Sequence, residues 1–206
     1  PNKELNFQHA LAEAFTLCDN NHCAMHTGTH SNRLFYYTGC NGPKPKNVAM
    51  LNNALSSLGS SDVGLTWNAY AERLEAAGVS WLVYQNLPDN YGCNQLASFR
   101  QFRKANEDAP AERRMIDKTG VVNPAYDPKL DGIQNPLFKG IANTMPNAGL
   151  FDTFKRDVMN NQLPQVSWVV PTAQYSEHPS PSSPVQGGWF VQELLDALTS
   201  NPEVWS

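Results

Sequence analysis

The sequence predicts an α/β fold built on a mostly parallel sheet. Two apolar runs have the length and composition of buried strands: "VSWLVYQNL", which begins at Val79, and "VSWVV", from Val166 to Val170. Each follows a segment with helical periodicity. Strands that alternate with helices are typical of parallel sheets covered on both faces. The ligand sites of such sheets lie at the carboxyl ends of the strands.

The first third of the chain predicts two helices separated by a short strand. Residues 5–15, "LNFQHALAEAF", carry apolar side chains at near-helical spacing. The mixed segment "TLCDNNHCAM" follows, and we interpret it as a short strand. The run "THSNRLFYYTG" predicts a second helix, with Thr29 or Ser31 as N-cap and Gly39 at its end.

The middle of the chain predicts a helix before the first long strand and an irregular region after it. "TWNAYAERLEAAG" has Thr66 as candidate cap and Gly78 as terminator. Another helix is expected in "LASFRQFRKANED". We predict that residues 86–147 form a lid or insertion, because the stretch rich in Pro, Asn and Gly is too polar for a core and too long for a simple connection.

The last third repeats the order of helix and strand. A helical stripe is formed by Leu150, Phe151, Phe154 and Val158. The second strand comes next, followed by the proline-rich loop "TAQYSEHPSPSSPVQGG" and a final helix, "WFVQELLDALTSN". This order predicts one domain, because 206 residues are enough to build a single large core.

Composition excludes two classes of protein. The formal net charge is -4, so no broad basic field is available to bind a nucleic acid. No apolar run is long enough to form a transmembrane segment. The chain begins "PNKELNFQHA", without an initiator Met or a signal peptide, and stops at "NPEVWS" directly after a helix-like run; we expect both ends to be cut.

The four cysteines carry no CxxC spacing. We expect buried thiols at Cys18, Cys23, Cys40 and Cys93 rather than a metal site, and a disulfide remains open. His22, His26 and His30 recur every four residues, which would align them on a helix, but Gly28 and the polar flanks interrupt that pattern. Five tryptophans fit core or sheet-flanking positions, and one of them could instead form one side of an aromatic cage for a quaternary ammonium group.

Two segments, "HTGTHSNR" and "YSEHPS", each follow a predicted strand and precede a predicted helix. Thr29 is a candidate nucleophile, because the N–H groups at a helix N-terminus stabilise an anion such as phosphate; the alternative, which the local sequence favours, is a plain N-cap. His178 could contact a phosphoryl oxygen or donate a proton, or be an ordinary loop histidine. Arg33 could grip a phosphate or pair with a carboxylate.

Four blocks, in order, resemble one known family. They are "FTLCDNNHCAMHTGTHSNRLFYYTG", "TWNAYAERLEAAGVSWLVYQNLPDNYGCN", "LPQVSWVVPTAQYSEHPSPSSP" and "LLDALTSNPEVWS". The family is that of the bacterial phosphocholine-specific phospholipases C, which includes related acid phosphatases and has a fold similar to that of alkaline phosphatase. The resemblance spans residues 5–206 and is weakest between Glu107 and Gly149.

The resemblance implies a three-layer α/β/α sandwich, incomplete in this chain, in which residues 1–206 are a fragment of a single phosphoesterase catalytic domain. Thr29 would attack phosphorus to give a phospho-threonine intermediate. His178 would contact the phosphoryl group or act as general acid, and Asn32, Arg33 and Glu177 match family positions that imply substrate binding. A divalent metal ion is implied, with Thr29 as one ligand and the others outside this chain, because the family's Glu-Asn and Asp-Glu-Asn-Asp-Gly segments are absent.

The implied reaction is hydrolysis of phosphatidylcholine to diacylglycerol and phosphocholine at a membrane surface, with sphingomyelin as a second candidate substrate. The family is usually exported, which implies a periplasmic or extracellular enzyme. Without the metal ligands we expect this fragment to be inactive alone. The alternatives are an acid phosphatase of the same fold and a non-catalytic module that binds phosphate or choline.

Overall fold

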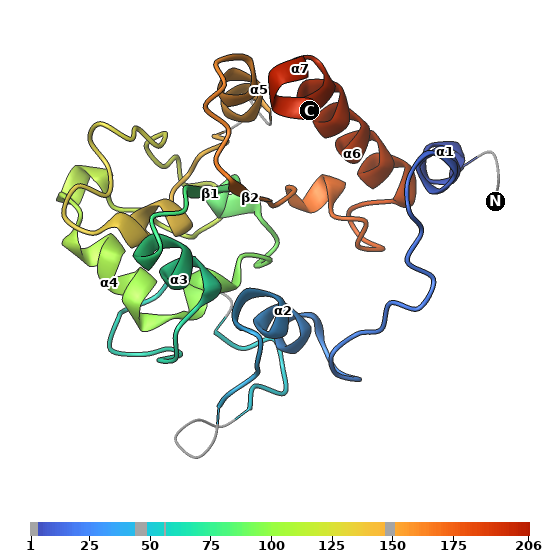
Figure 1. The fold of residues 1–206 in the computed structure, drawn as a ribbon. Coiled ribbons are helices and arrows are strands. Elements are labelled where there is room, and N and C mark those ends of the chain that lie inside the picture. The colour runs from blue at the N-terminus through green and yellow to red at the C-terminus, as the bar shows by residue number, and fades with distance from the viewer. Residues whose placement is uncertain (1–3, 44–48, 56, 147–150) are drawn as a thin grey trace. The chain divides into compact units, whose positions relative to one another are not determined.

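The computed structural model describes residues 4–43, 49–55, 57–146 and 151–206 (Figure 1). The chain divides into two compact units. Unit 1 consists of Pro1–His22, Phe151–Leu163 and Pro171–Ser206, and unit 2 of Cys23–Leu150 and Pro164–Val170.

Unit 2 contains a parallel pair of strands, β1 (Trp81–Tyr84) and β2 (Val166–Val169). Trp81 is in register with Val166 and Tyr84 with Val169. All four residues of β1 are buried, which explains its continuous apolar sequence. This mixed arrangement of helices around a small parallel sheet is compatible with an α/β fold, while the three-layer, alkaline-phosphatase-like arrangement stays a prediction.

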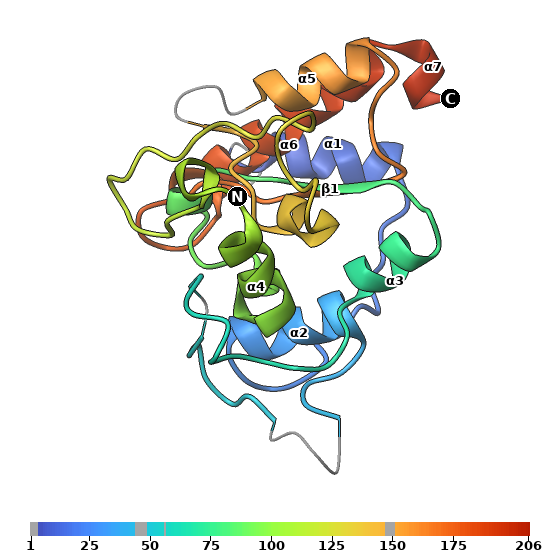
Figure 2. The same cartoon turned by 90° about the vertical axis from the view of Figure 1, so that its left-hand side faces the viewer.

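Three α-helices pack in unit 2: α2 (Thr29–Thr38), α3 (Tyr70–Ala76) and α4 (Arg100–Asp108). In Figure 2 α4 lies over α2 in projection, whereas Figure 1 shows the two helices apart, with α3 between them. The buried face of α2 includes Leu34 and Tyr37, and the Tyr37 ring stacks on Trp168 of β2 at a centroid distance of 5.8 Å. The helix therefore rests on the sheet through aromatic contacts, as its apolar spacing predicts.

The irregular region 86–147 contributes much of the core of unit 2. Besides α4 it contains short 3₁₀ turns at Leu87–Asp89, Gln95–Ser98, Ala111–Arg113 and Pro136–Gly140. Phe99, Phe102, Phe138 and Ile141 are almost completely buried. The expectation that this stretch is too polar for a core is therefore wrong, because several of its large apolar side chains are buried, although Ile116, Val122 and Ile133 are exposed. Its role as a lid or insertion stays a prediction.

Unit 1 is built from helices: α1 (Asn6–Ala14), α5 (Asp152–Met159), α6 (Pro184–Thr199) and α7 (Pro202–Trp205), with a 3₁₀ turn at Ala173–Tyr175. Its core includes the rings of Phe151 and Phe190, whose centroids lie 4.9 Å apart. Phe154 and Val158 of the predicted stripe are also buried, whereas Leu150 lies outside the described residues.

Several sequence-based boundaries need correction. Residues 16–25 form no strand, because this polar segment is mostly exposed. Thr66 does not cap α3, which begins at Tyr70 after Ala69; the Glu72 carboxylate accepts the Ala69 N–H at 2.7 Å. The last long helix begins at Pro184 rather than Trp189, since Ser183 caps it and proline fits the first helical position.

Candidate functional site

Thr29 is the first residue of α2 and its side chain is exposed. The N-cap is Gly28, in an extended conformation, so neither Thr29 nor Ser31 is the cap that the sequence suggested. The buried Ser31 hydroxyl instead donates to the Met50 carbonyl at 2.6 Å. Within the described ranges, Thr29 Oγ1 has no hydrogen-bond partner. The hydroxyl is therefore available for chemistry rather than used as a cap.

The first turn of α2 presents backbone N–H groups that the helix itself cannot satisfy, and these favour an anion. One of them has a partner from a distant loop: Asn53 Oδ1 accepts the His30 N–H at 3.2 Å. A Cβ at Gly28 would lie 2.9 Å from the same oxygen, so glycine makes room for Asn53. Asn53 could not be predicted from the sequence, because it lies in a loop without periodicity.

Asn32 fixes the chain that precedes Thr29. Its Nδ2 donates to the carbonyl oxygens of Met25, Thr27 and Gly28 at 3.0, 3.2 and 3.2 Å, and its Oδ1 accepts the Met25 N–H at 3.0 Å. The whole amide is thereby engaged with residues 25–28. This geometry supports a positioning role, and substrate binding by Asn32 stays a prediction.

Arg33 is half-buried on α2, close to the side chains of His30, Tyr37 and Cys93. Burial raises the pKa of Tyr37 and of Cys93, and the nearby Arg33 charge opposes both shifts. Its Nε is buried and has no hydrogen-bond partner among the residues described. Neither phosphate binding nor a carboxylate partner is visible for Arg33, and its predicted binding role is untested.

His30, beside Thr29, is 5% exposed and its Nδ1 has no partner in the described part of the chain. Burial lowers the pKa of His30, and the Arg33 charge lowers it further, while backbone acceptors at Ala54 and Gly92 oppose the shift. The neutral imidazole is therefore favoured in the folded protein.

In unit 1, Glu177 and His178 lie in the exposed loop between β2 and α6. Glu177 has a φ of +61°, a conformation that costs energy for a residue with a side chain. Its side chain lies against Gly187 on α6: a Cβ there would meet Glu177 Cγ at 2.0 Å. Glycine at 187 therefore permits this placement of the carboxylate.

Hydrogen bonds set the orientation of the His178 ring. Its Nδ1 lies 2.9 Å from the Ser180 carbonyl oxygen and 3.5 Å from the Ser180 backbone nitrogen. A protonated Nδ1 donates to the carbonyl, and an unprotonated Nδ1 accepts the Ser180 N–H, so both tautomers find a partner in this loop. The backbone is held by hydroxyls: Ser182 Oγ accepts the Glu177 N–H and Ser176 Oγ accepts the His178 N–H.

The predicted site residues thus fall into two sets. Thr29, Asn32 and Arg33 share α2 of unit 2, and Glu177 and His178 share one loop of unit 1. Of the two strands predicted to precede these segments, only β2, which precedes the Glu177 loop, is present.

No group of three or more His, Cys, Asp or Glu side chains in the described ranges has the arrangement of a metal site. Of the three regularly spaced histidines only His30 lies on a helix, and His22 contacts Asn20 instead. Divalent cations need several oxygen ligands, and the resemblance implies one of them here, Thr29. The described residues do not fit a metal by themselves, and the predicted metal rests on the family resemblance.

The cysteines and tryptophans divide by burial. No disulfide forms among the four cysteines; Cys93 is buried, but Cys18 and Cys23 are exposed, so the expectation of buried thiols is wrong for those two. Trp67, Trp81 and Trp168 are core residues, whereas Trp189 and Trp205 are 41% and 47% exposed. Only the exposed pair can contact a ligand in solution.

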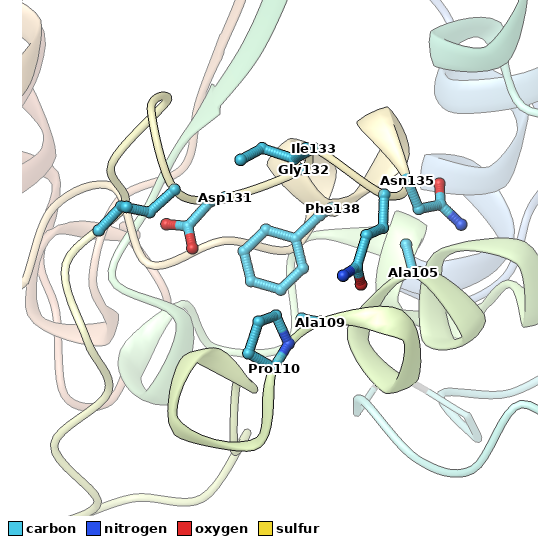
Figure 3. Close-up of a pocket in the computed structure, with 10 residues that line it drawn as sticks. Ala105, Ala109, Pro110, Asp131, Gly132, Ile133, Asn135 and Phe138 are labelled. Atoms are coloured by element: carbon cyan, nitrogen blue, oxygen red, sulfur yellow. The ribbon is translucent and has the colours of Figure 1, made fainter.

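A small cavity of about 110 Å³ in unit 2 is lined by Asp131, Asn135 and Phe138, and the side chains of the first two have hydrogen-bond partners within the fold (Figure 3). Figure 3 shows the Phe138 ring between Asp131 and Asn135. The buried Asp131 carboxylate accepts two hydrogen bonds from Arg113, at 2.7 and 2.5 Å, and also accepts the Asp127 N–H. None of the predicted site residues lines this cavity.

Among the described residues, no helix is both long and apolar enough to cross a membrane.

Comparison with known proteins gives the family. The chain is 43% identical over 205 residues to a non-hemolytic phospholipase C of Pseudomonas aeruginosa, covering 99% of this chain and 25% of that protein. It is 34% identical to a non-hemolytic phospholipase C of Burkholderia pseudomallei, over 98% of this chain and 27% of that protein.

A third relative is phospholipase C A of Mycobacterium tuberculosis, 33% identical over 98% of this chain and 34% of its own length. The chain thus spans about a quarter to a third of the length of these curated relatives. The model of the Phosphoesterase family matches residues 1–206. The chain belongs to the Phosphoesterase family.

Proposed function

We propose that the protein is a phospholipase C, a phosphoric diester hydrolase in which Thr29 is the nucleophile. The observation that carries this proposal is the exposed Thr29 hydroxyl at the N-terminus of α2, beside backbone N–H groups that favour an anion. A phosphoryl group bound there gains hydrogen bonds without needing a nearby cationic side chain. The resemblance to named phospholipases C supplies the reaction class.

The proposed reaction has two steps, formation and hydrolysis of a phospho-threonine. The Thr29 oxygen attacks phosphorus as its proton leaves, forming a phospho-threonine and breaking the bond to the diacylglycerol oxygen, which takes up a proton. Water then attacks phosphorus, releasing phosphocholine and returning the proton to Thr29. Choline phospholipids, phosphatidylcholine first and sphingomyelin second, are the proposed substrates at a membrane surface.

His178 is proposed to contact the phosphoryl group or to protonate the leaving oxygen. Its support is the "YSEHPS" block and the orientation of the ring by the Ser180 backbone. Glu177, Asn32 and Arg33 are proposed to support binding. We also propose export of the protein and dependence on a divalent metal; no step is derived through the metal, because the described residues form no site for it.

The test uses the complete gene product and p-nitrophenylphosphorylcholine. Thr29→Ala is expected to abolish release of p-nitrophenol, and Thr29→Ser to retain part of it, because serine keeps the nucleophilic oxygen. Acid-quench mass spectrometry should detect phosphocholine on residue 29. Full activity of Thr29→Ala would contradict the proposal.

Substrate choice separates the proposal from an acid phosphatase. A phosphatase would hydrolyse p-nitrophenyl phosphate at least as fast as the choline diester, whereas a choline-selective enzyme loses rate without the trimethylammonium group. Trp189 is the described residue best suited to this selectivity, since it is exposed and lies 4.9 Å from the Tyr175 ring in the same unit as Glu177. Trp189→Ala should reduce the preference for choline, and Trp189→Phe should preserve it.

A further inference from the structure

Arg103, on α4, is a buried cation held by backbone oxygens. It is 2% exposed, and its guanidinium donates to the carbonyls of five residues: Leu55, Ser57, Ser60, Val63 and Ala97. Three of these bonds, to Ser57, Val63 and Ala97, are 2.8 Å long. In the described part of the chain no carboxylate forms an ion pair with it.

This arrangement has a clear physical consequence. A buried charge is costly unless polar groups surround it, and a guanidinium has five N–H groups to satisfy. The segment that carries four of the five carbonyls, from Leu55 to Val63, forms no helix or strand where it is described. Arg103 therefore supplies the hydrogen bonds that secondary structure would otherwise provide.

A second side chain of α4 holds the same segment. The Glu107 carboxylate accepts the Ser61 N–H at 2.8 Å and the Ser61 hydroxyl at 2.5 Å. These bonds lower the pKa of Glu107, so the carboxylate stays charged at neutral pH. Two ionised groups on one helix thus hold the backbone at Leu55, Ser57 and residues 60–63.

The segment continues directly into the candidate site. Asn53 lies two residues before Leu55 and accepts the His30 N–H in the first turn of α2. Its Oδ1 also lies against Gly28, where a Cβ would approach to 2.9 Å. A shift of the backbone at Leu55 would therefore move the side chain that holds the turn carrying Thr29.

We propose that Arg103 is a positioning residue for Thr29. It binds the Ser57 carbonyl at 2.8 Å and, together with the Ser98 hydroxyl, the Leu55 carbonyl; this backbone positions Asn53, and Asn53 holds the first turn of α2. The catalytic consequence rests on the proposed function, but the physical link between Arg103 and the His30 N–H does not.

Hydrogen exchange on this chain tests the physical link. Arg103→Lys keeps the charge but lacks the donors for five carbonyls, so the His30 amide should exchange faster, on the order of tenfold, while the β1 amides stay protected. Arg100→Lys is the matched control, because Arg100 is exposed on the same helix. Unchanged exchange at His30 in Arg103→Lys would overturn the proposal.

A second variant keeps the test decisive if Arg103→Lys unfolds the unit, which faster exchange in β1 would reveal. Asn53→Ala removes the acceptor of the His30 N–H without touching α4, and it should raise exchange at His30 by a similar factor. The double variant should then exchange no faster than Asn53→Ala alone, since both changes act through the same bond. Additive increases would overturn the proposed order of contacts.

The catalytic consequence is tested in the complete gene product. Arg103→Ala should lower kcat for p-nitrophenylphosphorylcholine on the order of tenfold with little change in KM, and millimolar guanidinium should restore part of kcat by filling the vacated space. Unchanged kcat, with Thr29→Ala inactive, would overturn the positioning role alone. If Thr29→Ala stays active, the proposed function fails, and the exchange result still decides the physical link.

Discussion

The two candidate segments are held in place by different means. The turn of Thr29 in unit 2 depends on residues far away in the sequence: Asn53 holds the His30 N–H, and Met50 accepts the Ser31 hydroxyl. The loop of Glu177 and His178 in unit 1 is held by hydrogen bonds to Ser176, Ser180 and Ser182, within five residues.

This difference has a chemical interpretation. A nucleophile must be placed accurately against phosphorus, and long-range contacts to a packed unit provide that accuracy. A residue that exchanges a proton with a leaving group can tolerate a more adaptable loop. The comparison predicts that changes near Thr29 cost more stability than equivalent changes near His178.

The largest expected difference in stability between the two segments is between Asn32→Ala, at the turn of Thr29, and Ser182→Ala, at the loop of His178. Removing the Asn32 amide takes away its bonds to Met25, Thr27 and Gly28, so we expect the free energy of unfolding to fall by about 2–3 kcal/mol. Ser182→Ala removes one acceptor for the Glu177 N–H and should cost about 1 kcal/mol. Urea unfolding of both variants measures the difference.

Asn32→Asp is the control for this prediction. It keeps the acceptor for the Met25 N–H but places a carboxylate oxygen opposite the carbonyls of Met25, Thr27 and Gly28, so its stability should fall at least as far as that of Asn32→Ala. Equal losses for Asn32→Ala and Ser182→Ala would show that the two segments are held equally firmly.

A smaller effect is expected from pH. Burial lowers the pKa of His30 below its ordinary value of 6.5, so the neutral ring is favoured in the folded protein. Its contribution to stability is present above pH 6.5 and is lost as the pH falls through the lowered pKa. The free energy of unfolding, followed from pH 7.5 downward, should decrease in the wild type and decrease less in His30→Gln.

The partly buried carboxyl group of Asp117 changes the stability with pH in the opposite direction. Burial raises the pKa of Asp117, so its contribution to stability is present below its ordinary value of 3.8 and is lost as the pH rises through the raised pKa. Asp117→Asn, which removes this titration, should therefore make the decline at acidic pH steeper. For the His30 prediction, an identical dependence of the unfolding free energy on pH in His30→Gln and the wild type would be the contradicting result.

The sequence predicted the elements that local patterns specify. The end of α2 at Gly39 follows from a left-handed glycine with φ of +77°, and β1 and β2 follow from continuous apolar runs. The strand expected at residues 16–25 was wrong, because a polar segment has no apolar face to bury. The start of α6 was missed although Ser183 and Pro184 carry a helix-start pattern.

The candidate site shows the same division. Thr29 and His178 were predicted because each lies in a recognisable block of sequence. Asn53 and Arg103 were not, since their roles depend on contacts between segments 23 to 48 residues apart. No periodicity or local spacing encodes a buried guanidinium that binds the carbonyls of an irregular segment.

The smallest change in stability is expected for Gly187→Ala, which separates position from folding in unit 1. The new methyl group would meet the side chain of Glu177, and that side chain can rotate away. Alanine also favours a helix interior over glycine by about 1 kcal/mol, so the net change in stability should be smaller than 1 kcal/mol. The carboxylate, however, must leave its place against α6.

Gly188→Ala is the matched control, because its methyl group would meet the flexible end of Gln8 instead of Glu177. If Glu177 supports substrate binding, Gly187→Ala lowers kcat/KM for the choline diester several-fold and Gly188→Ala does not. Equal activity of the two variants would show that the Glu177 carboxylate can move without consequence. The strained φ of Glu177 would then serve the loop alone, as a turn conformation that the local serine hydroxyls stabilise.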